Sequence, residues 1–158
     1  MTGAGVEIGP LRDPEEVPAC AAMMAESEPW RTLGRDYPEC LARVADGTKE
    51  RLAARSGDEI AGFLILDMRG AFRGYIQTVC VAPGRRGSGI GSALVRHAEA
   101  RVFRESRNVF LCVSSFNPGA LRLYERLGYE RVGELRDYLV RGHSELLMRK
   151  TTGPLWER

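Results

Sequence analysis

The chain has 158 residues, of which 44% are hydrophobic and 28% are charged, and both fractions are ordinary for a folded domain. Its formal net charge of +2 gives no support to non-specific binding of nucleic acid or of an anionic membrane. No stretch approaches the roughly 20 apolar residues of a membrane span, and the first residues lack the pattern of a signal peptide. The sequence predicts one cytoplasmic globular domain over residues 1–158, with its core at about 6–150 and a loosely held tail.

The first half of the sequence predicts strands and helices separated by proline and glycine. Asp13 is a good N-cap and Pro14 suits the first helical position, so a helix is expected to begin there. In chain order, the expected elements are a strand at 6–12, helices at 14–26 and 38–45, a hairpin at 51–55 and 60–69, and a strand at 74–82.

The second half contains the clearest helical pattern, because Ile90, Leu94, Ala98 and Val102 recur at four-residue spacing and form one apolar stripe. The other expected elements are a buried strand at 108–115, a helix at 118–127, and strands at 129–140 and 145–150 around a turn at 141–144. The element order βααβββαβαββ is typical of an α/β or α+β domain with one central sheet of about seven strands and about four helices.

The four cysteines, Cys20, Cys40, Cys80 and Cys112, are too widely spaced for a CxxC motif or a metal site. Each lies among apolar neighbours, which is typical of small buried side chains in a reducing compartment. We therefore expect buried thiols rather than metal ligands or a cysteine nucleophile.

The glycine-rich segment RRGSGIG, residues 85–91, joins an expected strand to an expected helix. Its glycines let the backbone approach a ligand closely, and the amides around Ser88 to Ser92 are unpaired donors at the positive end of a helix. Together with Arg85 and Arg86 they predict a phosphate or pyrophosphate site. A turn that merely starts a helix is the alternative.

Two common nucleotide motifs do not fit this segment. A P-loop would need a lysine where Ile90 stands, and the GxGxxG fingerprint would need its third glycine at Ser92. The phosphate ligand is therefore expected to be bound in another way.

Two segments in this order resemble the GCN5-related N-acetyltransferase (GNAT) superfamily. VCVAPGRRGSGIGSALV carries its [RQ]xxG-x-[GA] signature as Arg86, Gly89 and Gly91. NPGALRLYERLGYERVG carries its asparagine, helix and LYExLGF pattern as Asn117, Leu123, Tyr124, Glu125, Leu127, Gly128 and Tyr129. The element order agrees with the family from about Val6 to Lys150.

The resemblance implies a mixed, mostly antiparallel sheet that is splayed between its fourth and fifth strands, with acetyl-CoA as co-substrate in the opening and no metal. Arg122 or Arg126 could contact its 3′-phosphate, and Asn117 could contact the pantetheine arm, cap its helix, or both. The residues implied to bind the cofactor are Val79, Val81, Arg86, Gly87, Ser88, Gly89, Ile90, Gly91, Ser92, Asn117 and Tyr124.

The resemblance also implies the chemistry of acetyl transfer. Tyr124 stands where the family commonly places the tyrosine that protonates the leaving thiolate, and a semi-buried aromatic is its alternative role. The backbone N–H of Val79 is expected to contact the oxyanion. Related enzymes often carry a catalytic glutamate where this chain has Cys112, or on the fourth strand, where it has Gln77 and Thr78.

The general base is therefore left open, with Glu28, His143, Glu145 and a water path as candidates. Trp30 is expected to cap the acceptor pocket or to anchor its loop, and Tyr138 to line the same cavity or to alternate in a strand.

The implied function is an N-acetyltransferase that moves the acetyl group of acetyl-CoA to a primary amine of a small molecule or peptide, by direct attack in a ternary complex. The alternatives are a non-catalytic acyl-CoA-binding regulatory module and a protein N-terminal acetyltransferase. A homodimer is expected because homodimers are frequent in the family.

Overall fold

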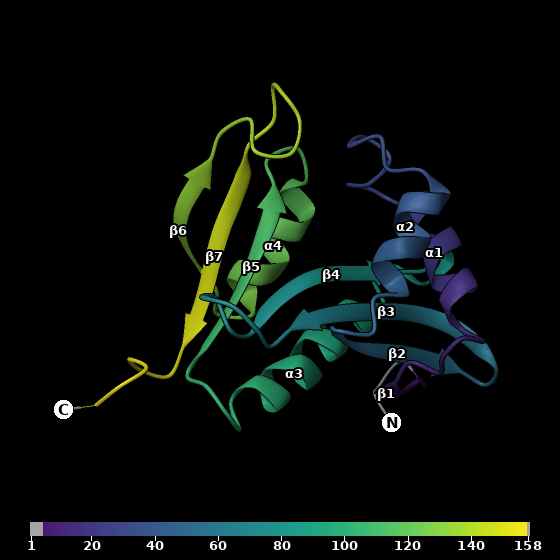
Figure 1. Cartoon of the computed structure of the whole chain (residues 1–158), viewed down its shortest axis with the longest axis horizontal. Helices are drawn as coiled ribbons and strands as arrows, with labels where there is room; N and C mark the ends of the chain where they lie inside the picture. Colours follow the sequence, from purple (N-terminus) through teal and green to yellow (C-terminus); the bar gives the residue numbers. More distant parts are fainter. Residues whose placement is uncertain (1–4, 158) are drawn as a thin grey trace.

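In the computed structural model, which describes residues 5–157, seven strands form one sheet in the order β1-β2-β3-β4-β5-β7-β6 (Figure 1). The strands are β1 (Glu7–Pro10), β2 (Glu50–Ser56), β3 (Glu59–Asp67), β4 (Tyr75–Val81), β5 (Asn108–Ser114), β6 (Glu130–Leu135) and β7 (Glu145–Thr151). The helices are α1 (Val17–Ala25), α2 (Tyr37–Val44), α3 (Ile90–Val102) and α4 (Pro118–Arg126), with a short 3₁₀ turn η1 (Pro83–Arg85) before α3. The predicted fold class and element order are confirmed.

The sheet opens between β4 and β5, which are parallel, whereas the other neighbouring strands are antiparallel. The two strands pair only through Tyr75 and Ile76 of β4. The next residue, Gln77, is a bulge, because the pairing of β4 with β3 skips it between Ile65 and Leu66. A bulge bends its strand, so β4 turns away from β5 and the two halves of the sheet diverge (Figure 1). The predicted splay is confirmed.

Each face of the sheet has its own hydrophobic core. The core that includes α3 contains the predicted stripe of Ile90, Leu94, Ala98 and Val102, each at most 1% exposed. Burying a leucine or isoleucine side chain contributes roughly 1.5–3 kcal/mol, so this stripe fixes the helix on the sheet. The second core lies under α1 and α2 and includes Trp30. These two cores hold β4 in place where it leaves β5.

The first helix begins later than predicted, at Val17 with Glu16 as its N-cap, rather than at Pro14 with Asp13 as its N-cap. The Asp13 carboxylate forms an ion pair with Arg51 of β2 instead of capping the helix. Glu16 occupies the N-cap position and pairs with Arg55, whose side chain is 9% exposed. These tertiary ion pairs determine where the helix starts.

The strand predicted at 129–140 is also shorter, because β6 ends at Leu135. Asp137 adopts a left-handed backbone with φ 52°, and its carboxylate accepts a 2.7 Å hydrogen bond from the Gly142 amide. This bond closes a loop over residues 136–144. Tyr138 therefore lies in a loop rather than in a strand.

The cysteines of this structure are free thiols, and Cys20, Cys40 and Cys80 are buried. Burial raises the pKa of Cys20 and of Cys80 to about 12, and it also raises the pKa of the half-buried Cys112. Within residues 5–157, no helix is long and apolar enough to cross a bilayer, and His, Cys, Asp and Glu form no cluster suited to a metal ion. At neutral pH the thiols are protonated and poor nucleophiles.

Candidate active site

A cavity of about 660 Å³, here called the donor cavity, lies at the N-terminus of α3 beside β4. Gly89 is the N-cap of α3, with φ 87° and no side chain to cap the first helical amides. These amides are free donors at the positive end of the helix dipole. Arg85 and Arg86 also line the cavity and add positive charge. The donor cavity is therefore suited to a phosphate or pyrophosphate group.

The residues predicted to bind the cofactor surround this cavity, with one exception. The exception is Ser88, whose hydroxyl donates to the carbonyl of Arg85 within the turn. The predicted residues that line the donor cavity are Val79, Val81, Arg86, Gly87, Gly89, Ile90, Gly91, Ser92, Asn117 and Tyr124.

Four further polar side chains are placed by the structure at or near the donor cavity. Arg126 lines the donor cavity, whereas Arg122 does not. The carboxamide oxygen of Asn117 accepts a hydrogen bond from the Ala120 amide at 3.3 Å, so the side chain caps α4 while it faces the cavity. Arg86 donates to the hydroxyl of Ser27 at 3.0 Å, which ties the glycine loop to the end of α1.

A second cavity of about 350 Å³, here called the acceptor cavity, lies on the other side of the splayed strands. Its walls are β4, β5 and the loops at 27–36 and 136–144, which flank the opening of the sheet in Figure 1. The residues that line both cavities are Glu28, Trp30, Val79, Asn117, Ala120 and Tyr124. The two cavities therefore meet at β4 and α4.

Tyr124 lies at this junction and is 8% exposed. Its ring packs edge-on against Tyr129 at a centroid distance of 5.9 Å, and the Tyr129 hydroxyl donates to the Glu99 carboxylate at 2.8 Å. Burial raises the pKa of Tyr124 to about 12. Its phenol is therefore protonated at neutral pH, and no residue between 5 and 157 makes a hydrogen bond with its hydroxyl.

Comparison with known proteins identifies this arrangement, because residues 16–129 match the Acetyltransferase (GNAT) family. The chain belongs to the GNAT acetyltransferase family. It is 35% identical over 143 residues to the N-alpha-acetyltransferase RimI of Mycobacterium tuberculosis, covering 85% of each protein.

Solved structures share the fold of this GNAT acetyltransferase at low sequence identity. One is the Arabidopsis thaliana NAA60 in complex with a bisubstrate analogue, with a TM-score of 0.76, 21% identity, and coverage of 92% of this chain and 97% of that one. Another is an aminoglycoside 6′-N-acetyltransferase complexed with coenzyme A, with a TM-score of 0.75, 20% identity, and coverage of 96% and 99%. This GNAT protein is an acetyl-CoA-dependent N-acetyltransferase.

Two of the candidates for the general base, Glu28 and His143, are poorly suited to that role in this GNAT structure. The Glu28 carboxylate accepts hydrogen bonds from the Thr32 amide at 2.9 Å and from its hydroxyl at 2.6 Å, and these bonds lower the pKa of Glu28. His143 packs against Phe116 at a centroid distance of 4.7 Å and lines neither cavity.

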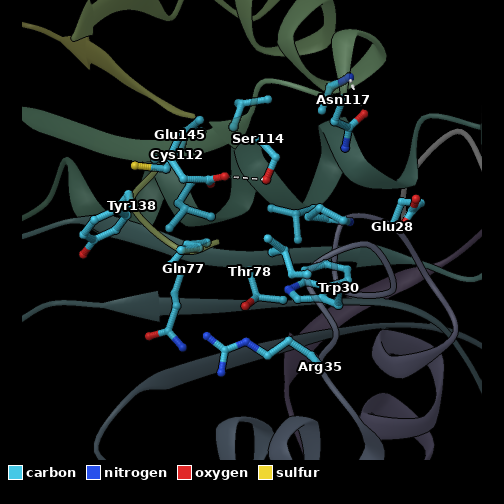
Figure 2. Close-up of a pocket in the computed structure, with 18 of the residues that line it drawn as sticks. Glu28, Trp30, Arg35, Gln77, Thr78, Cys112, Ser114, Asn117, Tyr138 and Glu145 are labelled. Atoms are coloured by element: carbon cyan, nitrogen blue, oxygen red, sulfur yellow. Dashed lines mark hydrogen bonds between the residues drawn. The ribbon is translucent and has the colours of Figure 1, made fainter. Parts of the chain in front are cut away.

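Glu145, the third candidate, is the first residue of β7 and lines the acceptor cavity with 5% of its surface exposed. Its carboxylate accepts a 2.6 Å hydrogen bond from the Ser114 hydroxyl, shown as a dashed line in Figure 2. Burial raises the pKa of Glu145. The antiparallel register places Ser114 opposite Glu145, so Cys112 lies on the same face of the sheet, two residues along β5.

The wall opposite Glu145 carries positive charge, because Arg35 and Arg43 line the acceptor cavity. Figure 2 shows Arg35 and Glu145 on different sides, with Gln77 and Thr78 between them. Burial and the neighbouring Arg35 lower the pKa of Arg43, and no carboxylate between residues 5 and 157 pairs with Arg43. Arg35 lies 3.7 Å from the Glu39 carboxylate, so the Arg43 guanidinium is the one that favours an anionic group in this part of the cavity.

Three more side chains, one polar and two aromatic, line the acceptor cavity. The Thr78 hydroxyl is buried and has no hydrogen-bond partner in the described part of the chain. Trp30 is 9% exposed, packs in the core under α1 and α2, and also lines both cavities, so it anchors its loop and faces the site. Tyr138 lines the acceptor cavity from its loop and is 62% exposed.

Sequence reasoning did not select Arg43, Ser114 or Tyr75 for the site. Arg43 looks like any exposed helical arginine, and Ser114 like the end of a buried strand. Their place in the acceptor cavity depends on how α2, β5 and β4 are arranged in space. No local motif marks that arrangement.

Proposed function

We propose that this enzyme transfers the acetyl group of acetyl-CoA to a primary amine that lies close to an anionic group, by direct attack in a ternary complex. The observation that carries the proposal is the pair of cavities that meet at Tyr124 and Val79. The donor cavity suits the pyrophosphate and pantetheine of acetyl-CoA, and the acceptor cavity suits a small polar amine.

Acetyl-CoA fits the donor side for two physical reasons. The amides of the first turn of α3, with Arg86, provide donors and charge for the pyrophosphate. Beyond Ile76, the edge of β4 that faces β5 has no strand partner, so its backbone is available to the amides of the pantetheine arm. The thioester then lies near Val79, where the cavities meet.

The transfer needs an oxyanion contact and an acid for the leaving group. The backbone N–H of Val79 contacts the oxyanion. Tyr124 keeps its proton at neutral pH and gives it to the departing thiolate sulfur. No acyl-enzyme forms on Cys112, because burial raises the pKa of this thiol and keeps it protonated.

The acceptor is an amine whose neighbouring group is acidic. Glu145 on one wall suits a cationic ammonium group, and Arg43, which lines the opposite wall with Arg35, suits a carboxylate or phosphate. The relationship to the Mycobacterium tuberculosis RimI supports a peptide α-amine, and in a peptide the anion would be an acidic side chain near the N-terminus. A small molecule with both groups would present the same chemistry.

The test is acceptor-dependent release of free thiol from acetyl-CoA. The panel contains short peptides that differ only in an acidic, neutral or basic second residue, with small amino acids, diamines and aminoglycosides. Faster release with acidic peptides or with small molecules bearing an anion supports the proposal and identifies the source of that anion. Preference for basic acceptors contradicts the acceptor class. If no amine causes thiol release while calorimetry shows that acetyl-CoA binds, the result supports the alternative of a non-catalytic acyl-CoA-binding module.

A further inference from the structure

Glu145 is a buried carboxylate without a matching cation. Its carboxylate forms no ion pair with any Arg, Lys or His between residues 5 and 157, and its hydrogen bond comes from the neutral hydroxyl of Ser114. Burying an uncompensated charge is costly, so such a group is expected to be neutral or to meet a cation from outside. The acceptor ammonium is a cation that enters this cavity.

Four other titratable groups face Glu145, and two of them, Tyr75 and Cys112, keep their protons at neutral pH. They are Tyr75 from β4, Cys112 from β5, and Tyr138 and His143 from the loop before β7. Burial raises the pKa of both Tyr75 and Cys112, so both are protonated at neutral pH. His143 lies outside the cavity lining, against Phe116.

Attack on the thioester requires a neutral amine, whereas at pH 7 an alkyl amine with a pKa near 10 is about 99.9% protonated and a peptide α-amine with a pKa near 7.8 is about 85% protonated. A carboxylate in the cavity that receives this ammonium can remove the proton, and its own raised pKa makes it a stronger base than an exposed glutamate. The open acceptor cavity then lets that proton pass on to solvent.

We propose, on the basis of the function proposed above, that Glu145 is the proton acceptor for the attacking amine, with Ser114 as the positioning residue for its carboxylate. One ammonium proton passes to Glu145, and the freed lone pair forms a C–N bond to the thioester carbon. The C–S bond then breaks, Tyr124 gives its proton to sulfur, and the second nitrogen proton returns to the Tyr124 oxygen. Glu145 releases its proton to solvent, which restores the enzyme.

The test compares Glu145→Gln with Glu134→Gln. Glutamine has the same shape and can still accept the bond from Ser114. Glu134 is a matched control, because it also accepts a serine hydroxyl, that of Ser144 at 2.8 Å, and lines neither cavity. For each protein, kcat and KM are measured from pH 5.5 to 9.5 with the best acceptor, and thermal unfolding shows whether the variant folds.

We expect Glu145→Gln to lower kcat on the order of 10²-fold at pH 7, with acetyl-CoA affinity unchanged. The defect should shrink by up to tenfold per pH unit until the pH reaches the pKa of the acceptor amine, because more of the amine is then already neutral. Glu134→Gln should match the wild type at each pH. A kcat within threefold of wild type, or a defect confined to KM with an unchanged pH profile, would overturn the assignment and leave the proposed function intact. If the wild type releases no thiol with any amine, both proposals fail together.

Discussion

Gly89→Asp tests whether the N-terminus of α3 holds the pyrophosphate of acetyl-CoA. A Cβ at Gly89 meets no atom within 4 Å, so the side chain fits, although φ 87° costs an L-residue about 1–2 kcal/mol. A carboxylate there would face phosphates held by the first amides of α3, and Coulomb's law gives the repulsion for a separation of roughly 6 Å. At an effective dielectric constant near 20, two phosphate charges repel it by about 5 kcal/mol, and physiological salt about halves this. The remaining ~2.5 kcal/mol weakens binding by roughly 70-fold.

Isothermal titration of acetyl-CoA measures the effect, and Gly57→Asp is its matched control. Gly57 also has a positive φ, 62°, and an open Cβ position, but it lies in the turn between β2 and β3 and lines neither cavity. Both variants should lose similar stability, and only Gly89→Asp should lose affinity. The loss should shrink as salt is added, since it is electrostatic. Wild-type affinity in a folded Gly89→Asp protein would refute the phosphate site.

Other substitutions test the remaining side chains. Tyr124→Phe should lower kcat on the order of 10²-fold and leave acetyl-CoA affinity nearly unchanged, and intact turnover would exclude Tyr124 as the acid. Arg43→Met should raise KM about tenfold for acceptors with an anionic group and not for neutral ones, and equal changes would contradict the anion contact. Glu16→Gln leaves the buried Arg55 guanidinium without its carboxylate partner. It should lower the free energy of unfolding by about 3 kcal/mol at pH 7 in denaturant melts. The pair lowers the pKa of Glu16, so its stabilisation is present above the ordinary value of 4.5 and should disappear as pH falls below it; an equal difference at pH 3 would argue against the pair.

The strands and helices could be predicted because local signals agree with the packing. The stripe from Ile90 to Val102 repeats with the period of a helix, and the core buries that stripe. Asn117 and Gly89 predict helix starts that depend on their own chemistry rather than on distant contacts. Where a distant partner intervenes, the local signal is misleading: Asp13 is a good N-cap by type, yet its carboxylate is bound to Arg51.

The donor side of the site was accessible to sequence reasoning because one continuous segment builds most of it. Residues 85–92 supply the turn, the free amides and the arginines in a row, so spacing alone indicates a phosphate site. The acceptor side is built by segments that are spread from Glu28 to Glu145, among them two loops, α2, α4 and the strands β4, β5 and β7. Arg43 and Glu145 are far apart in the chain and face the same cavity only because the sheet splays at the Gln77 bulge.

The pairing of β5 with β7 explains how a carboxylate can be present in the acceptor cavity while β5 carries none there. The enzymes that this chain resembles often have a glutamate where it has Cys112. Ser114 lies opposite Glu145 and Cys112 lies two residues along the same face, so side chains from either strand reach the same part of the cavity. On β5 itself, Cys112 is a thiol that stays protonated at neutral pH because burial raises its pKa, so it cannot accept the amine proton. The carboxylate is found only when the register is known, because the adjacent strand supplies it from 33 residues further along the chain.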